Sequence, residues 1–213
     1  MSNPSLTGKD FFTIDPRHCA LIVIDMQNAF VGKGAPFETP GAREMIPRLE
    51  RLIGRARELQ MPIVWTQSDH RPPYGGLMLR KFPAIAKEHV LWHGEPSFEM
   101  YPEMIQSREG PLEHRIVKHK FDAFFETGLD AILRYHRTDT VIITGTATNA
   151  CCESTARSAF MRDYKVVFPS DANATFDEAM HRATLVNIDL LFGRVLTTEE
   201  LLAEIGARAA AAD

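Results

Sequence analysis

Hydrophobic residues along this chain gather in short continuous runs instead of alternating with polar residues. Six of these runs are rich in β-branched side chains, and they span Cys19–Met26, Pro62–Gln67, Arg115–His119, Thr140–Gly145, Lys165–Pro169 and Gly193–Thr198. Continuous runs of this kind are typical of strands that are buried on both faces. The pattern therefore predicts six buried strands.

Segments with helical periodicity lie between most of these runs. They span Ala42–Leu59, Gly128–His136, Ala150–Tyr164, Asp177–Leu191 and Glu199–Ala207. Strands and helices that alternate along a chain are typical of a parallel sheet with helices on both faces. We therefore expect a doubly wound α/β fold built on a mainly parallel, six-stranded sheet.

One stretch, about residues 68–113, interrupts this alternation. It is rich in proline, glycine and aromatic residues and includes the segments RPPYGG and WHGEPSFEMYPEM. A connection of this length in a compact domain is usually a lid or a binding loop. Since no repeat or linker divides the chain, we expect a single domain over residues 1–213 with a lid or binding loop in this stretch.

Composition narrows the functional classes. The chain has a net charge of -4, and its Lys and Arg residues are scattered, which argues against a nucleic-acid partner. No segment approaches the roughly 20 apolar residues that cross a bilayer, and the N-terminus lacks the pattern of a signal peptide. We therefore expect a cytoplasmic protein that acts on a small molecule, with reduced thiols because its three cysteines include an adjacent pair.

Three titratable residues occur where apolar runs end. Asp25 ends the first run, Lys118 ends the third, and Cys151 follows the fourth. Each has a structural alternative by itself: a turn or helix cap for Asp25, a surface charge for Lys118, and a small buried side chain for Cys151. Ligands of open parallel sheets bind beyond the carboxyl ends of the strands, so the three together favour a catalytic site.

The segment GTATNACCEST predicts a turn from strand to helix, with Thr148 or Asn149 as the helix cap. Cys151 would lie in the first helical turn, where free N–H groups and the helix dipole lower the pKa of a thiol. Cys152 is rotated about 100° around the helix, so we expect one reactive cysteine and one packed cysteine. Glu153, at about 200° from Cys151, is interpreted as a structural or interface charge.

The motifs around these residues resemble those of the isochorismatase-like cysteine hydrolases. Asp25 lies in IDMQNAF, which is similar to the D-x-Q segment of the family's catalytic aspartate. Lys118 begins KHKFDAF, similar to a K-x-x-[YF]-x-x-F segment, and Cys151 lies in GTATNACC, similar to the G-x-x-T-[ND]-x-C segment of the nucleophile. The resemblance extends from about Ala20 to Leu202 and implies that these three residues form a catalytic triad.

The resemblance also implies details of the site and of the assembly. A cis peptide bond would join Thr146 and Ala147, and the N–H groups of Ala147 and Cys151 would form an oxyanion hole. No cofactor is implied. Members of the family assemble as dimers or tetramers, so a homo-oligomer is expected.

Nicotinamidases of this superfamily add a metal site, built from an Asp-x-His segment and further histidines. Matching His70 to that pattern leaves Ser68 in the position of the aspartate, and His89 and His93 lie far along the same stretch. We therefore expect no metal site. His70 is interpreted as a hydrogen-bonded loop residue.

The segment TNACCEST looks most like the TNxCxEST helix of ureidoacrylate amidohydrolases and related hydrolases. The resemblance therefore favours a cysteine amidohydrolase that cleaves a C–N bond of a small linear amide with a ureido or carbamoyl group, such as ureidoacrylate, biuret, triuret or an N-carbamoyl compound. Asn149, Phe30, Trp65 and Trp92 are the candidate substrate-binding residues. A nicotinamidase or another hydrolase of the family, and a non-catalytic binding or scaffold protein, remain alternatives.

Overall fold

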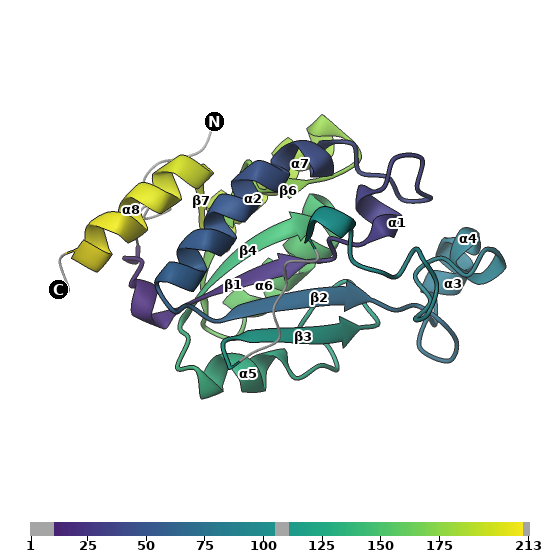
Figure 1. Ribbon diagram of the computed structural model, residues 1–213, viewed down its shortest axis with the longest axis horizontal. Coiled ribbons are helices and arrows are strands. Elements are labelled where there is room, and N and C mark those ends of the chain that lie inside the picture. Colours follow the sequence, from purple (N-terminus) through teal and green to yellow (C-terminus); the bar gives the residue numbers. More distant parts are fainter. Residues whose placement is uncertain (1–10, 105–110, 211–213) are drawn as a thin grey trace.

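The computed structural model describes residues 11–104 and 111–210, whose core is a seven-stranded sheet (Figure 1). The strand order is β3-β2-β1-β4-β5-β7, with β6 pairing β4 beside this path, and all these pairings are parallel. The strands are β1 (Cys19–Ile24), β2 (Ile63–Ser68), β3 (Glu113–Lys118), β4 (Thr140–Thr146), β5 (Lys165–Pro169), β6 (Asn173–Ala174) and β7 (Arg194–Leu196). The predicted fold class is confirmed. The sequence pattern missed only β6, because two residues are too few to form a hydrophobic run.

Eight α-helices surround the sheet within the described residues. They are α1 (Asn28–Val31), α2 (Gly41–Glu58), α3 (Met78–Lys81), α4 (Pro83–Lys87), α5 (Leu129–Tyr135), α6 (Glu153–Phe160), α7 (Glu178–Leu191) and α8 (Thr198–Ala210). Short turns of other helix types are η1 (Pro16–His18), η2 (Pro102–Met104) and η3 (Thr148–Cys152). All five predicted helices are present, although α6 begins later than expected, and α3 and α4 lie in the stretch predicted as a lid. No helix in the described ranges combines the length and apolar character needed to span a membrane.

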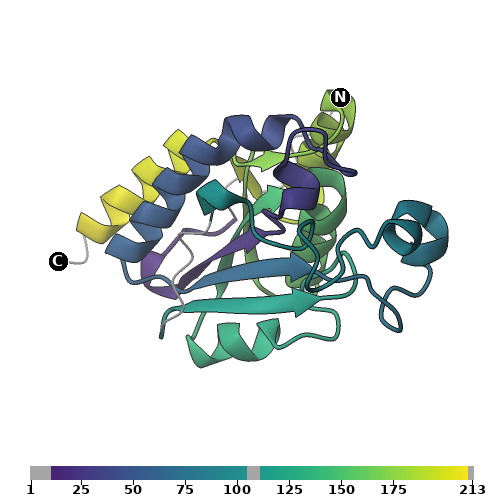
Figure 2. The same ribbon diagram turned by 45° about the vertical axis from the view of Figure 1, so that its right-hand side comes forward.

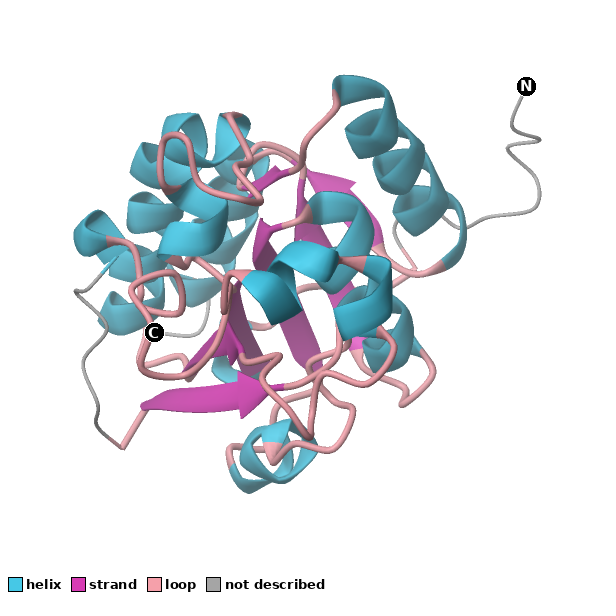
Figure 3. Ribbon diagram, turned by 90° about the vertical axis from the view of Figure 1, so that its right-hand side faces the viewer, coloured by secondary structure: helices cyan, strands magenta, loops and turns pink. Residues whose placement is uncertain are grey.

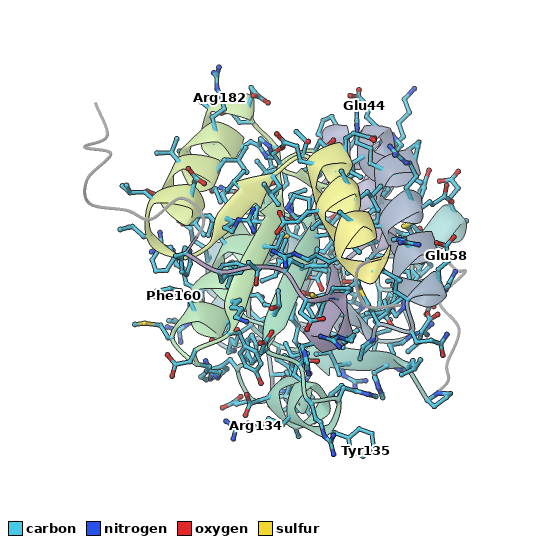
Figure 4. All side chains as sticks on the ribbon, turned by 90° about the vertical axis from the view of Figure 1, so that its left-hand side faces the viewer. Glu44, Glu58, Arg134, Tyr135, Phe160 and Arg182 are labelled. Carbon is cyan, nitrogen blue, oxygen red and sulfur yellow. The ribbon has the colours of Figure 1, made fainter. Side chains whose placement is uncertain are left out.

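The two faces of the sheet bury different sets of side chains, which explains the continuous apolar runs. In β1, Leu21 and Val23 pack into the cluster beneath α2 and α8, whereas Ala20, Ile22 and Ile24 pack into the cluster with α5, α6 and α7. Figure 3 shows the sheet between these two sets of helices. Figure 4 shows α8 and α2 together over one face, viewed from the end of the sheet opposite the strand arrowheads of Figure 1.

Amphipathic spacing decides which side of α2 meets the sheet. Its buried positions recur every three or four residues, so they form one stripe along the helix: Ala42, Met45, Ile46, Leu49, Leu52, Ile53 and Ala56. Its charged residues point outward, as Glu44 and Glu58 do in Figure 4. The stripe packs α2 against one face of the sheet, where the helix contacts β1, β4 and β6.

Strand register aligns the strand ends that carry polar residues. Ile24 pairs with Gly145 of β4, and Ser68 of β2 pairs with Lys118 of β3. Because the strands are parallel, these residues and Asp25 reach the same edge of the sheet. Figure 2 shows α3 and α4 extending beyond this edge, away from the main body of the sheet.

Candidate active site

Three strand ends meet at the carboxyl edge of the sheet. Asp25 follows β1, Lys118 ends β3, and Cys151 lies in the turn η3 after β4. The Nζ atom of Lys118 lies 2.7 Å from Oδ2 of Asp25 and 3.3 Å from Sγ of Cys151. The structure therefore brings together the three residues that the sequence singled out.

Two hydroxyl groups of β2 complete the surroundings of Asp25. Thr66 donates a hydrogen bond to Oδ1 at 2.6 Å, and Ser68 donates one to Oδ2 at 2.8 Å. Lys118 Nζ donates to the Ser68 hydroxyl at 2.8 Å and to the carbonyl of Lys120 at 3.0 Å. Sequence reasoning missed Thr66 and Ser68. The sequence signal that could have found them is the spacing of two polar residues at the end of a buried strand. Residues two apart in a strand point to the same face, so both hydroxyls can reach one partner.

The charges of this cluster are buried together. Both Asp25 and Lys118 are 0% exposed. Burial by itself lowers the pKa of Lys118, but the opposing charge of Asp25, with a further contribution from the Cys151 sulfur, outweighs it and holds that pKa above its ordinary value. Asp25 and Lys118 therefore form a buried ion pair.

The Cys151 thiol is protonated at neutral pH. Burial raises its pKa to about 12, and the attraction of the Lys118 ammonium offsets only part of that effect, while the charge of Asp25 adds to it. The sequence-based expectation of a lowered thiol pKa is therefore wrong. It considered the helix terminus alone, whereas desolvation dominates in the folded protein.

The chain before Cys151 turns sharply where β4 meets β1. Gly145 has φ 115, and a Cβ at this position would lie 2.1 Å from the carbonyl oxygen of Ile24, so only glycine fits. The peptide bond between Thr146 and Ala147 is cis, as the resemblance implied. This turn carries the chain from the sheet into η3.

Cys151 itself lies in a π-helical turn, not in the first turn of an α-helix. Neither predicted cap acts as one, because both side chains have other partners. Thr148 Oγ1 pairs with Nδ1 of His181 at 2.9 Å, and Asn149 Oδ1 accepts a hydrogen bond from Thr175 at 2.5 Å. The two neighbouring elements, α7 and the segment after β6, thus hold the turn in place.

The adjacent cysteines have different surroundings. Cys151 lines a cavity, whereas Cys152 is fully buried in the core and does not line it. Burial raises the pKa of Cys152 well above its ordinary value. Of the two, Cys151 alone is placed to meet a ligand.

The cavity beside Cys151 has a volume of about 90 Å³. Its lining is formed by Phe30, Phe37, His70, Met78, Phe82, Ile85, Leu91, Phe121, Ala147, Ala150, Cys151 and Phe176. Met78, Phe82, Ile85 and Leu91 come from the stretch predicted as a lid or binding loop. The cavity therefore lies between that stretch and the carboxyl edge of the sheet.

The Isochorismatase domain matches residues 19–200 of the chain, which is most of its length. The chain belongs to the isochorismatase family. It is 32% identical to nicotinamidase 3 of Arabidopsis thaliana, over 85% of this chain and 86% of the relative. It is also 32% identical to ureidoacrylate amidohydrolase RutB of Methylobacterium radiotolerans, over 85% of this chain and 77% of that relative.

Solved structures agree with this family assignment. A cysteine hydrolase from Pseudomonas syringae pv. phaseolicola superposes with a TM-score of 0.85 and 28% identity, covering 92% of this chain and 96% of that one. N-carbamoylsarcosine amidase from Thermoplasma acidophilum has the same fold, with a TM-score of 0.71 at 24% identity, covering 85% of this chain and 97% of that one. The predicted family and enzyme class, a hydrolase, are confirmed.

Of the four predicted substrate-binding residues in this isochorismatase-family chain, the structure places only Phe30 along the cavity. Trp65 packs in the core under α2, and its indole N–H donates to Glu113 at 3.1 Å. Trp92 stacks on His89 with ring centroids 3.9 Å apart. Asn149, held by its hydrogen bond to Thr175, also does not line the cavity. Substrate contact by Trp65, Trp92 and Asn149 stays a prediction that the cavity lining does not support, because residue type shows what can bind a ligand but not which way a side chain points.

His70 lies in a loop, lines the cavity at a buried position and has a hydrogen bond to the backbone of His119, which fits the interpretation of a hydrogen-bonded loop residue. Its backbone N–H donates to the carbonyl of Leu91, but its ring Nδ1 has no hydrogen-bond partner among the described residues. Burial, together with the nearby Lys118 ammonium, lowers the pKa of His70 to about 4, so the ring is neutral at pH 7. Ser68, in the position of a metal-binding aspartate, is instead bonded to Asp25 and Lys118. The described ranges contain no group of three or more metal-ligating side chains.

Glu153, beside the cysteines in sequence, has structural partners. It forms an ion pair with Arg157 at 2.6 Å and accepts a hydrogen bond from Thr184 of α7 at 2.7 Å. The hydrogen bond from Thr184 ties α6 to α7, which fits the predicted structural charge.

Proposed function

We propose that this isochorismatase-family hydrolase cleaves a C–N bond of a small amide or ureide, with Cys151 as the nucleophile. The observation that carries the proposal is the buried ion pair of Lys118 and Asp25, 3.3 Å from a thiol that lines a cavity. Both relatives that are 32% identical carry names of amide hydrolases. A carboxylate, an ammonium and a thiol supply the base, the charge stabiliser and the nucleophile of such a reaction.

The first half of the reaction transfers the substrate's acyl or carbamoyl group to sulfur. Asp25 takes the proton of the Cys151 thiol as sulfur bonds to the carbonyl carbon. The thiol needs this base because its pKa is raised. The negative oxygen accepts hydrogen bonds from the N–H groups of Ala147 and Cys151. The C–N bond then breaks as Asp25 donates the proton to nitrogen, so ammonia or an amine leaves and a thioester or thiocarbamate remains.

The second half regenerates the thiol. Asp25 accepts a proton from water while the water oxygen attacks the same carbon. The C–S bond breaks and the thiol regains its proton from Asp25. The Lys118 ammonium, 2.7 Å from Asp25 and shielded from solvent, balances the charge of the carboxylate between these transfers.

For the substrate, we propose a linear amide with a ureido or carbamoyl group. The similarity to a ureidoacrylate amidohydrolase and the TNACCEST segment support this choice. A nicotinamidase is the second candidate, since the relative of that name is equally similar in sequence. Ser68 at the position of the metal-binding aspartate argues against it. We also propose that residues 68–113, of which 105–110 lie outside the described residues, act as a binding loop. We propose further that the chain forms a homo-oligomer and that it works in the cytoplasm.

A non-catalytic scaffold is a poorer explanation of the site. Burying two charges is unfavourable unless they are paired and fully hydrogen-bonded, and a scaffold gains nothing from placing them beside a thiol. Ammonia release tests the proposal on a panel of nicotinamide, ureidoacrylate, biuret, triuret, N-carbamoyl amino acids and simple amides. Rapid acid quenching and intact-mass measurement should then reveal the acyl or carbamoyl group on Cys151. Turnover without a covalent adduct in the Cys151 peptide, under single-turnover conditions, would contradict the mechanism.

A further inference from the structure

The cavity beside Cys151 is lined almost entirely by apolar side chains. Five of its lining side chains are phenylalanines. Five more are apolar: Met78, Ile85 and Leu91 of the lid stretch, and Ala147 and Ala150 of the turn before Cys151. Of the lining residues that the structure describes, His70 and Cys151 alone contribute polar side chains. A ligand that fills this space exchanges water for apolar contacts over most of its surface.

An aromatic wall links the sheet edge to the predicted lid. The rings of Phe30 and Phe37 stack with centroids 6.1 Å apart, and Phe37 meets Phe82 edge to face at 5.9 Å. Phe82 lies between α3 and α4, so the wall continues into that segment. Contacts among the three rings hold the wall in place without a ligand.

No charged side chain among the described residues lines the cavity to receive a carboxylate. His70 is neutral at pH 7, because burial lowers its pKa to about 4. The Lys118 ammonium beneath the cavity is already bonded to Asp25, Ser68 and the Lys120 carbonyl. A substrate carboxylate placed against the phenylalanines would lose its hydration without a compensating charge.

We infer that the substrate is a small uncharged amide or urea whose other substituent is apolar, a short alkyl group or one ring that packs against Phe30, Phe82 and Phe176. This rests on the proposed function and narrows it, since it disfavours ureidoacrylate, N-carbamoyl amino acids, biuret and triuret. The cavity volume of about 90 Å³ sets the small size. The reacting carbonyl lies at Cys151 and Ala147, and the apolar group extends toward α3 and α4.

Matched substrate pairs test the inference. One pair is 4-methylpentanamide and succinamate, and the other is 3-methylbutylurea and N-carbamoyl-β-alanine. Each pair has the same length and branching and differs in an isopropyl group against a carboxylate. We expect kcat/KM to favour the isopropyl compound by roughly 100-fold, because the carboxylate of the other compound would be buried without a hydrogen-bond partner. Equal rates, or a preference for the carboxylate, would overturn the inference.

A positive charge introduced into the cavity gives a second test, because it should improve the use of substrates with a carboxylate. Phe82→Arg should reduce the preference for the isopropyl compound at least tenfold, on the order of one charge-assisted hydrogen bond, while Phe82→Leu should preserve it. Phe176→Arg repeats the test at a half-exposed position, 49% exposed, where a charge is tolerated by the fold. An unchanged substrate ratio in both folded arginine variants would contradict the inference.

Binding separates this inference from the proposed function. Cys151→Ser keeps the shape of the site and removes the thiol, so calorimetry can measure affinity without turnover. We expect 4-methylpentanamide to bind more tightly than succinamate. If no amide or urea is hydrolysed by the wild type but this preference holds, the proposed function fails, and only the apolar binding preference of the cavity stands. If hydrolysis occurs but succinamate binds at least as well, the inference fails and the proposed function stands.

Discussion

The ammonium of Lys118 lies 2.7 Å from the carboxylate of Asp25, with both side chains fully removed from solvent. This pair brings the ends of β3 and β1 together across β2, and it lies next to the Cys151 thiol. A buried ion pair is costly to assemble and more costly to break, so its consequences for activity and for stability can be separated.

Breaking the pair should destabilise the protein. Lys118→Met leaves the Asp25 charge buried without its partner, and we expect the free energy of unfolding to fall by about 3–5 kcal/mol. Adding Asp25→Asn should recover part of this loss, because the uncompensated charge is removed. Urea denaturation at pH 7 measures both changes. If Asp25→Asn lowers the free energy of unfolding by the same amount in the Lys118→Met variant as in the wild type, the two residues are not coupled.

The two cysteines should respond differently to substitution. Cys151→Ala removes the proposed nucleophile, and we expect turnover to fall by on the order of 10⁶-fold. Cys152→Ala deletes only a packed sulfur, so activity should stay near that of the wild type with a loss of about 1 kcal/mol of stability. Ammonia release under saturating substrate measures the first effect and thermal denaturation the second. Activity that depends on Cys152 instead would reverse the assignment of the nucleophile.

Ser68 should prove to be a positioning residue. Its hydroxyl donates to Asp25 and accepts from Lys118, so Ser68→Ala leaves both groups short of a hydrogen bond. We expect kcat to fall by roughly 10- to 100-fold with little change in KM, because Ser68 does not line the cavity. Ser68→Thr keeps the hydroxyl and should restore part of kcat. A rise in KM at constant kcat would instead indicate that Ser68 contacts the substrate.

His70 should make stability depend on pH. Its pKa is about 4 in the folded protein and near 6.5 in the unfolded chain, so the unfolded chain binds more protons between these values. Stability is therefore fully present above pH 6.5 and decreases as the pH falls toward 4, by up to about 3 kcal/mol.

Comparing the wild type with His70→Gln isolates this effect. The variant has no group that titrates at this position, so the difference in unfolding free energy between pH 7 and pH 4.5 should be smaller than in the wild type. Urea titrations at the two pH values measure it. An identical pH dependence in both proteins would show that His70 is not buried in its neutral form.

Much of the fold follows from local patterns. Continuous apolar runs identify β1, β2, β4 and β5, because strands covered on both faces need apolar residues at nearly every position. The prediction of six buried strands is wrong for β3 and β7, since these edge strands are only partly buried. The stripe of α2 is equally local. By contrast, β6 and the short helices α3 and α4 depend on the neighbours that hold them, and their sequences carry no period long enough to detect.

The sequence by itself determined the family and the three residues Asp25, Lys118 and Cys151, because their types and positions at strand ends are properties of the chain. Tertiary structure alone decided the protonation of the thiol, since desolvation depends on everything packed around Cys151. It also decided that Thr66 and Ser68 hold the carboxylate and that phenylalanines, not Trp65 or Trp92, line the cavity. These features depend on which side chains from distant segments meet, and that is set by strand register and packing rather than by any single segment.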